Sequence, residues 1–255
     1  MDLICQNIHL FTQLQYRILK RGWPTRPDVL GEAPISSASR VASIFGEELI
    51  ERLPGKIVAD FGSGEGREAI ELARHGAAKV YGVEIRPELH ETGRRLAREA
   101  GVDKLCEFVT RPPEKADLVL SIDAFEHFDD PEFILREMDS MLAEDGEVWI
   151  SFGPPWYHPT GGHLFSVFPW AHLVFSEKAL IRWRSDFKHD GATRFSEVAG
   201  GLNQMTIARF ERLIEASPLR IASFTVVPIR KLKPLHNRIT REFTTAVVRC
   251  HLVKK

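Results

Sequence analysis

The chain has 255 residues, of which 44% are hydrophobic and 27% are charged, as is usual for a globular protein with one large core. Its formal net charge of -1 at pH 7 gives no general electrostatic attraction to nucleic acid or to anionic membranes, so we expect neither as a partner. Three well-separated cysteines argue against a disulfide framework, and a start without a basic, continuously apolar leader predicts a cytoplasmic protein.

The first 54 residues predict a helical extension ahead of the main domain. Apolar residues in 3–20 recur at the spacing of an amphipathic helix. A connector rich in proline and glycine follows, and it predicts irregular structure. Ser37 or Ser39 is suited to cap a second helix, which we expect to run to about residue 53.

Residues 55–152 alternate between short apolar runs and helical patterns, which is typical of an α/β domain. This rhythm predicts a doubly wound parallel sheet with helices on both faces. The expected strands are 56–62, 79–84, 106–110, 116–122 and 147–152, and the expected helices are 67–75, 86–100 and 131–143, with Gly146 opening the turn into the last of these strands.

The alternation stops after Phe152, and residues 153–217 are predicted to form an insertion ahead of two closing strands in residues 218–255. The longest nearly uncharged stretch of the insertion contains histidines, glycines and prolines, so we expect no stable membrane insertion. The aromatic side chains of the insertion are suited to cover an acceptor pocket or to pack a small core of their own. These aromatic residues are Trp156, Tyr157, Phe165, Phe168, Trp170 and Phe175.

Three glycines alternate in VADFGSGEGREA, residues 58–69, directly after the first strand predicted for the sheet. Gly62, Gly64 and Gly66 leave the backbone bare, so that its amides can approach a ligand closely. The helix that follows offers free N–H groups and a partial positive charge to an anionic group. Because ligands of open parallel sheets bind at this edge, the loop predicts a ligand site rather than a simple turn.

A carboxylate at the end of the next strand strengthens this hypothesis. Glu84 follows the loop by about 20 residues, where a carboxylate can accept hydrogen bonds from both hydroxyls of an adenosine ribose. Arg67 stands where a dinucleotide-binding motif has its third glycine, which packs closely beside a pyrophosphate. The loop therefore favours a mononucleoside ligand over NAD.

Three segments taken in order, VADFGSGEG, VYGVEI and ADLVLSIDAFEHFDDPEFILREMDSMLAEDGEVWIS, resemble the successive motifs of the class I S-adenosylmethionine-dependent methyltransferases. The resemblance covers residues 56–152 and is closest to the small-molecule branch of the family. It implies S-adenosyl-L-methionine as cofactor and a Rossmann-like seven-stranded sheet whose last strand is antiparallel. It also leaves open whether the N-terminal helix closes over the cofactor or only packs on the sheet.

The resemblance also assigns cofactor-binding roles to individual residues. Asp60 would hold the amino group of the methionine part, directly or through water. Glu84 would bind the ribose hydroxyls, and Ile85 would pack on the adenine. Ser121 and Asp123 would line the cofactor near its sulfonium. The loop residues that would pass under the methionine and ribose parts are Gly62, Ser63, Gly64 and Gly66.

One position departs from the family pattern. Many members carry an acidic residue after the third strand, where it contacts the adenine amino group. Thr110 and Arg111 stand there in this chain. A backbone contact or Thr110 is therefore expected to replace the carboxylate.

Histidines supply the candidate catalytic groups. His127, in a Glu-His pair frequent in the small-molecule branch, is suited to act as a base near neutral pH or to brace the loop. His163, beside a glycine pair, is the second candidate base. His158 and His172 join it in the insertion, but no carboxylate or cysteine there completes a familiar ligand spacing, so we expect no metal.

The sequence as a whole is interpreted as a methyltransferase that acts on a small-molecule acceptor. Oxygen is favoured over nitrogen or carbon as the methylated atom, and the aromatic insertion favours an acceptor with an aromatic or lipid-linked portion. Two alternatives stay open at this stage: a non-catalytic binding or scaffold protein of the same fold, and an NAD(P)-dependent oxidoreductase.

Overall fold

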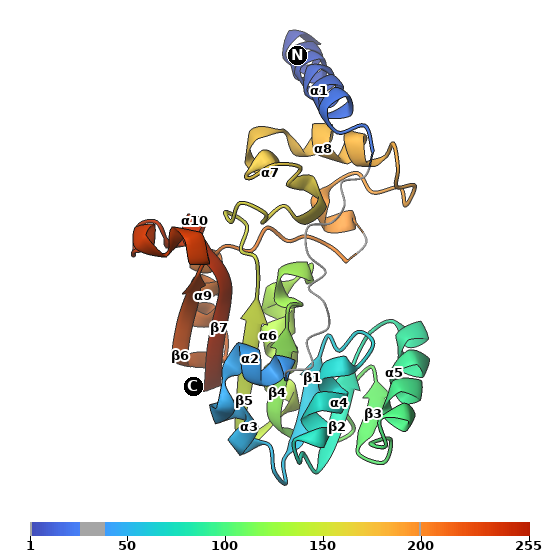
Figure 1. The fold of residues 1–255 in the computed structure, drawn as a ribbon, viewed down its shortest axis with the longest axis vertical. Helices are drawn as coiled ribbons and strands as arrows, with labels where there is room; N and C mark the ends of the chain where they lie inside the picture. The colour runs from blue at the N-terminus through green and yellow to red at the C-terminus, as the bar shows by residue number, and fades with distance from the viewer. Residues whose placement is uncertain (1, 26–38, 199) are drawn as a thin grey trace.

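The computed structural model describes residues 2–25, 39–198 and 200–255, and the strands of these residues form one seven-stranded sheet (Figure 1). The strands are β1 Ile57–Phe61, β2 Lys79–Val83, β3 Cys106–Val109, β4 Ala116–Ile122, β5 Leu142–Phe152, β6 Leu219–Pro228 and β7 Thr245–Lys254. They follow the order β3-β2-β1-β4-β5-β7-β6.

The direction of the strands confirms the predicted fold class. β1 pairs in parallel with both β2 and β4, and the outer pairs β2–β3 and β4–β5 are parallel too. β7 runs antiparallel to β5 and to β6. Strand order reverses between β1 and β4, so the carboxyl ends of these two strands flank the crevice in which such sheets bind ligands.

Helices cover both faces of the sheet because each presents one apolar stripe to it. On one face, Leu72 and Ala97 are fully buried with the apolar side of the N-terminal helices. On the other face, Met138 and Phe210 are fully buried against the strands. The first face carries α2 Arg40–Phe45, α3 Glu47–Arg52, α4 Arg67–Arg74 and α5 Pro87–Glu99, and the second carries α6 Pro131–Met141 and α9 Ile207–Ala216.

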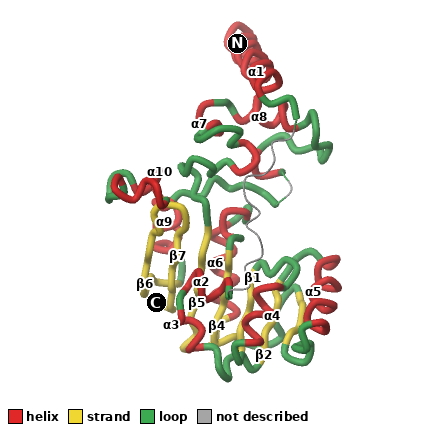
Figure 2. Tube along the Cα trace, in the orientation of Figure 1, coloured by secondary structure: helices red, strands yellow, loops and turns green. Residues whose placement is uncertain are grey.

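The insertion forms a separate apolar cluster beyond the end of β5, and much of it is loop (Figure 2). Phe165 and Trp183 are buried there together with Leu19, which comes from the N-terminal helix. The elements of this region are the 21-residue helix α1 Asp2–Gly22 and the shorter η2 His163–Phe165, α7 Ala171–Val174, α8 Glu177–Arg184 and η3 Phe195–Glu197. No helix among the described residues is long and apolar enough to cross a bilayer.

Two expected elements differ from the structure. The single helix expected up to residue 53 is two helices, because Gly46 has a φ of 82° and its backbone N–H donates to the Ala42 carbonyl, which ends α2. Ser39 caps α2 through its side chain, whereas Ser37 lies outside the described residues. Gly146 lies inside β5 rather than in a turn before it, in the part of the strand where pairing with β4 shifts from Leu142 to Glu147. A Cβ on Gly146 would come within 3.1 Å of the Ala116 carbonyl oxygen of β4, which explains the glycine.

The remaining short elements connect the strands at the functional edge and between β6 and β7. After β4 the chain forms η1 Phe125–His127, and between β6 and β7 it forms η4 Arg230–Leu235 and α10 Arg241–Thr244. η1 begins three residues after β4 ends, at the edge where the strand order predicts the crevice, although its Phe125 side chain is buried in the core.

Candidate cofactor and acceptor site

The glycine loop between β1 and α4 is hydrogen-bonded to the end of β2. The backbone N–H groups of Gly62 and Ser63 both donate to the Val83 carbonyl, at 2.9 and 3.1 Å. Gly66 N–H donates to the Ser63 carbonyl at 2.8 Å and closes the turn. All three glycines have a positive φ, of 80°, 52° and 81° along the chain, which explains the residue type at each position.

The three glycines differ in what surrounds them. A Cβ on Gly64 would meet no atom within 4 Å, so this position faces open space. A Cβ on Gly62 would lie 3.0 Å from the Ala124 side chain, and one on Gly66 would lie 2.1 Å from the Phe108 ring. Gly64 is thus the position where a ligand can approach the bare backbone, while Gly66 permits close packing of the loop on β3. A cofactor contact of Gly66 stays a prediction.

Glu84 links the loop to the end of β2. Its carboxylate accepts a hydrogen bond from Gly64 N–H at 3.1 Å and further bonds from the backbone and guanidinium of Arg86. Burial tends to raise the pKa of Glu84, but the Arg86 hydrogen bonds and charge outweigh it, so the pKa is lowered and the group stays ionised. The two residues singled out by their spacing in the sequence are therefore in direct contact.

Several buried polar atoms in this region lack a partner within the described part of the chain. They are Asp60 Oδ2, Ser63 Oγ and Ser121 Oγ, and the residues are between 0% and 5% exposed. Burial raises the pKa of Asp60 well above its usual range, and the nearby Glu68 charge raises it further. Buried polar groups are rarely left unsatisfied in native proteins, so these atoms fit a site completed by a polar, cationic ligand.

The N-terminal extension reaches the site through Arg40, a residue that sequence reasoning missed. Its guanidinium pairs with Glu68 of α4 and with Asp123, 2.6 Å away at the end of β4. Asp123 itself has a φ of 47°, which turns the chain sharply after the strand. The sequence around Arg40 does not predict these ion pairs, because they depend on how α2 packs beside α4.

Ile85 lies where an adenine-packing residue is expected, with its side chain 84% exposed. Arg111 hydrogen-bonds to Glu137 and Ser140 of α6, so its side chain is engaged on that helix. Thr110 is exposed at the end of β3. The role of these residues in holding adenine stays a prediction.

The two candidate bases come together with a glutamate. Ring centroids of His127 and His163 lie 5.2 Å apart. One ligand atom from each of these histidines and one carboxylate oxygen of Glu126 all lie within 4.8 Å of one another. Burial raises the pKa of Glu126 to about 8, and burial with the neighbouring histidines lowers the pKa of His163 to about 4.

The other two histidines of the insertion have structural hydrogen bonds. His158 Nδ1 lies 2.9 Å from the Thr160 hydroxyl, and burial lowers its pKa to about 4. His172 Nε2 donates to the Trp156 carbonyl at 2.7 Å, and its Nδ1 lies 2.9 Å from the Ser166 hydroxyl. Both ring nitrogens of His172 are therefore hydrogen-bonded, whereas His158 is hydrogen-bonded through Nδ1, which also accepts from Thr160 N–H at 3.0 Å.

The aromatic side chains of the insertion mostly pack on one another. Trp156 and Phe165 are buried, and both contact the Phe195 ring in tilted arrangements, with ring centroids 5.5 and 4.7 Å from it. Phe168 contacts Trp23 from the end of the N-terminal segment, with ring centroids 5.4 Å apart. The interpretation of these residues as a small core of their own is therefore supported, and a role in covering the acceptor stays a prediction.

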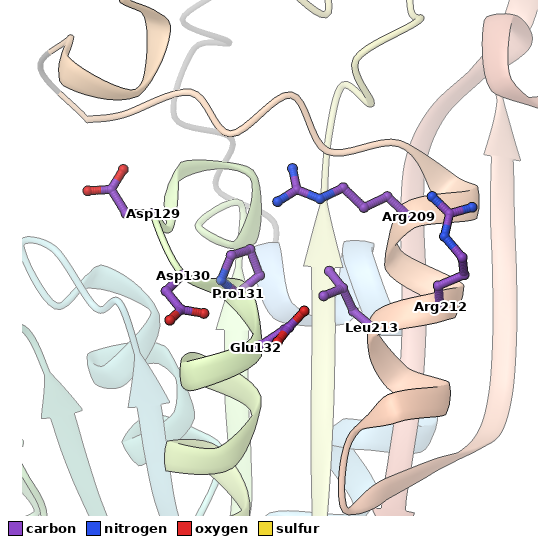
Figure 3. Close-up of a pocket in the computed structure, with 7 residues that line it drawn as sticks. All are labelled: Asp129, Asp130, Pro131, Glu132, Arg209, Arg212 and Leu213. Carbon is purple, nitrogen blue, oxygen red and sulfur yellow. The ribbon is translucent and has the colours of Figure 1, made fainter.

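A separate groove of about 470 Å³ lies between the start of α6 and α9 (Figure 3). Asp129, Asp130 and Glu132 line one side, while Arg209 and Arg212 project from α9 on the other. None of its lining residues belongs to the glycine loop or to the histidine pair. The groove is polar and open, and the chemistry described above lies elsewhere.

Comparison with known proteins identifies the domain that carries the glycine loop. A family profile described as a methyltransferase domain matches residues 59–150. Sarcosine/dimethylglycine N-methyltransferase of Halorhodospira halochloris is 36% identical over 124 residues, 46% of this chain and 44% of that enzyme. Ubiquinone biosynthesis O-methyltransferase of Neisseria meningitidis serogroup C is 33% identical over 106 residues, 39% of this chain and 44% of that enzyme. The chain thus spans under half the length of these curated relatives.

Solved structures support the same fold at low sequence identity. A geranyl diphosphate methyltransferase in complex with S-adenosylmethionine has a TM-score of 0.53 at 16% identity, covering 82% of this chain and 84% of that one. An S-adenosylmethionine-dependent methyltransferase of Aquifex aeolicus has a TM-score of 0.51 at 14% identity, covering 86% of this chain and 94% of that one. At these identities the likeness shows the fold alone.

Proposed function

Residues 59–150 belong to the class I S-adenosylmethionine-dependent methyltransferases, and on this premise we propose that the chain transfers the methyl group of S-adenosyl-L-methionine to a small-molecule acceptor. The observations that carry the proposal are the contact between Gly64 N–H and the Glu84 carboxylate and the buried Asp60 Oδ2, which has no partner among the described residues. Oxygen is the methylated atom that we favour. The relatives named above include both an N- and an O-methyltransferase and do not discriminate.

Residues of the loop and strand ends would hold the cofactor. The Glu84 carboxylate is suited to accept the ribose hydroxyls, for which the Arg86 guanidinium, 55% exposed, must give up at least one of its hydrogen bonds. Asp60 would meet the methionine ammonium directly or through water, which supplies the buried carboxylate with a charged donor. Gly64 offers bare backbone beneath the ligand, and Ile85 offers an exposed apolar surface to the adenine.

The bound cofactor supplies a methyl group that is already activated by its sulfonium. The protein therefore needs mainly to position the acceptor in line with that methyl group and to exclude water. An acceptor hydroxyl must also lose its proton during transfer, and we assign that role to His127. His127 Nδ1 lies 2.9 Å from the Gly201 carbonyl and donates to it, so the lone pair is on Nε2. His163 lies beside it as the second candidate.

The proposal is tested by calorimetric titration with S-adenosylmethionine and S-adenosylhomocysteine. Glu84→Ala should weaken binding of both ligands by about 1–3 kcal/mol, because the ribose hydroxyls lose a charged acceptor. Glu88→Ala is the matched control, since Glu88 is exposed on the first turn of α5. If Glu84→Ala bound both ligands as tightly as the unmodified protein does, Glu84 would not be the residue that binds the ribose.

The same titration separates the alternatives. Failure to bind either ligand would favour a non-catalytic scaffold protein of this fold. A rise in thermal unfolding temperature with NAD or NADP, and none with S-adenosylmethionine, would favour an oxidoreductase.

A further inference from the structure

Three side chains with metal-binding atoms converge from two distant segments. Glu126 and His127 are neighbours in η1 after β4, and His163 begins η2 in the insertion. His163 has a φ of 51°, a backbone conformation that is rare for a residue with a side chain. This geometry brings one ligand atom from each of the three residues within 4.8 Å of the others.

Each of these three residues has at least one ligand atom that makes no hydrogen bond among the described residues. Glu126 is 2% exposed, its Oε1 accepts from Gly153 N–H at 3.2 Å, and its Oε2 has no partner among the described residues. His127 has Nε2 free, because Nδ1 donates to the Gly201 carbonyl. Among the described residues no hydrogen bond reaches the ring of His163, whereas His172 is hydrogen-bonded at both ring nitrogens and His158 Nδ1 accepts from Thr160 N–H.

Two imidazoles and one carboxylate make up a familiar set of ligands for Zn²⁺ at sites that keep a coordination position open. Histidine ligands of such sites usually donate their second N–H to a carbonyl or carboxylate, as His127 does to Gly201. We infer that Glu126, His127 and His163 bind one divalent transition-metal ion, with Zn²⁺ as the best match. Mg²⁺ and Ca²⁺ fit less well, because both prefer oxygen ligands.

The role of this ion in methyl transfer rests on the proposed function. An acceptor hydroxyl or thiol that occupies the open position would have its pKa lowered by the positive charge. Its proton would then pass to water, its electron pair would form the new bond to the methyl carbon, and the breaking carbon–sulfur bond would leave its pair on sulfur. His127 would serve as a ligand in that state and not as the base. The site would select small acceptors with an ionisable hydroxyl or thiol.

The metal site is tested by titrating ZnCl₂ into the full chain, freed of metal with a chelator and of any purification tag. We expect one ion per chain by calorimetry. Replacing it by Co²⁺ should give the intense visible absorption of a four- or five-coordinate site, and added Zn²⁺ should abolish that absorption. The control is a protein without a metal site in the same chelator-treated buffer. The inference would be overturned if the heat of Zn²⁺ titration and the Co²⁺ absorption were no greater than in this control.

Variants locate the ion. His163→Ala and Glu126→Gln should each weaken Zn²⁺ binding by ~10-fold or more, since even supporting partners of ligands contribute this much. His189→Ala is the control for surface histidines, because His189 is exposed in the same insertion, and it should leave the affinity unchanged. Circular dichroism establishes that each variant is folded. Equal affinities in all variants, or loss only in His189→Ala, would place the ion elsewhere and overturn the inference.

The experiment keeps this inference separate from the proposed function. S-adenosylhomocysteine is titrated into the same metal-free samples. Cofactor binding without metal binding rejects the metal site alone. Metal binding without cofactor binding leaves the metal site and rejects the methyltransferase proposal.

Discussion

Gly64 and Gly66 have similar sequence surroundings, yet the structure gives them different constraints. Both have a positive φ, which costs an alanine about 1–2 kcal/mol. A Cβ on Gly64 would point into open space, whereas one on Gly66 would overlap the Phe108 ring. Gly64→Ala should therefore lower the free energy of unfolding in urea only by this strain energy, but it should bind S-adenosylmethionine more weakly. Gly66→Ala should lose clearly more stability.

Gly55 provides the control for strain alone. It has a φ of 75°, and a Cβ on it would meet no atom within 4 Å. Gly55→Ala should match Gly64→Ala in stability and keep the cofactor affinity of the unmodified protein. Equal cofactor affinity in the two variants would mean that nothing binds over Gly64.

Asp60 makes cofactor binding depend on pH in a defined direction. Its pKa is raised above the usual range by burial first and then by the Glu68 charge, so below that raised pKa the free protein holds a proton there. A bound ammonium group favours the carboxylate, so binding should release a proton. The release should decline as pH rises through the raised pKa, because the carboxyl is then already ionised. Calorimetry in buffers of different ionisation enthalpy measures it.

Asp60→Asn isolates this contribution from the titration of the cofactor's own amino group. The variant should show no proton release at the lower pH values while retaining its fold. Release of the same size in Asp60→Asn would show that another group titrates on binding.

At the scale of elements, the Phe108 ring of β3 packs against the glycine loop, β2 and α5. The ring lies where a Cβ would project from Gly66, Gly82 or Gly93, with the nearest ring atom 2.1 to 2.6 Å away. Gly93 is inside α5, where alanine would by itself stabilise the helix by about 1 kcal/mol. We expect Gly93→Ala to destabilise the protein instead, by roughly 1–3 kcal/mol, because the core is overpacked.

A double-mutant cycle checks this cause. Phe108→Leu leaves room beside α5, so the second change, Gly93→Ala, should then be neutral or stabilising in urea unfolding. If the two changes simply added, the clash with the ring would not be the reason for the glycine.

The helices and strands could be predicted well where a sequence pattern is compatible with only one kind of secondary structure. Each buried strand of the parallel sheet is a short apolar run, and the order of runs and helices leaves few topologies. The break at Gly46 was missed because glycine inside a helical pattern is compatible with either outcome. The common location of Gly64 and Glu84 at one edge of the sheet could be predicted from the order of the motifs. The hydrogen bond between them, the Arg40 ion pairs and the contact of His127 with His163 depend on how the segments pack.

At the scale of the whole molecule, α1 belongs with the insertion rather than with the sheet. Leu19 is fully buried in the cluster that contains Trp183 of α8. Gln15 accepts hydrogen bonds from the backbone N–H and hydroxyl of Ser176, and Trp183 Nε1 donates to the Trp23 carbonyl. Two segments separated by the entire cofactor domain therefore form one packed unit.

This arrangement predicts a local response when the unit is weakened. Leu19→Ala removes a large buried side chain, and similar changes cost roughly 2–5 kcal/mol. Because Leu19 contacts the insertion cluster, hydrogen exchange should quicken in α1 and α8 while β1, β4 and β5 keep their protection. Leu14→Ala, at a position 55% exposed on the same helix, should change neither. If hydrogen exchange quickened in the central strands as much as in α8, the insertion and the sheet would unfold together. The separate apolar clusters would then not be independent unfolding units.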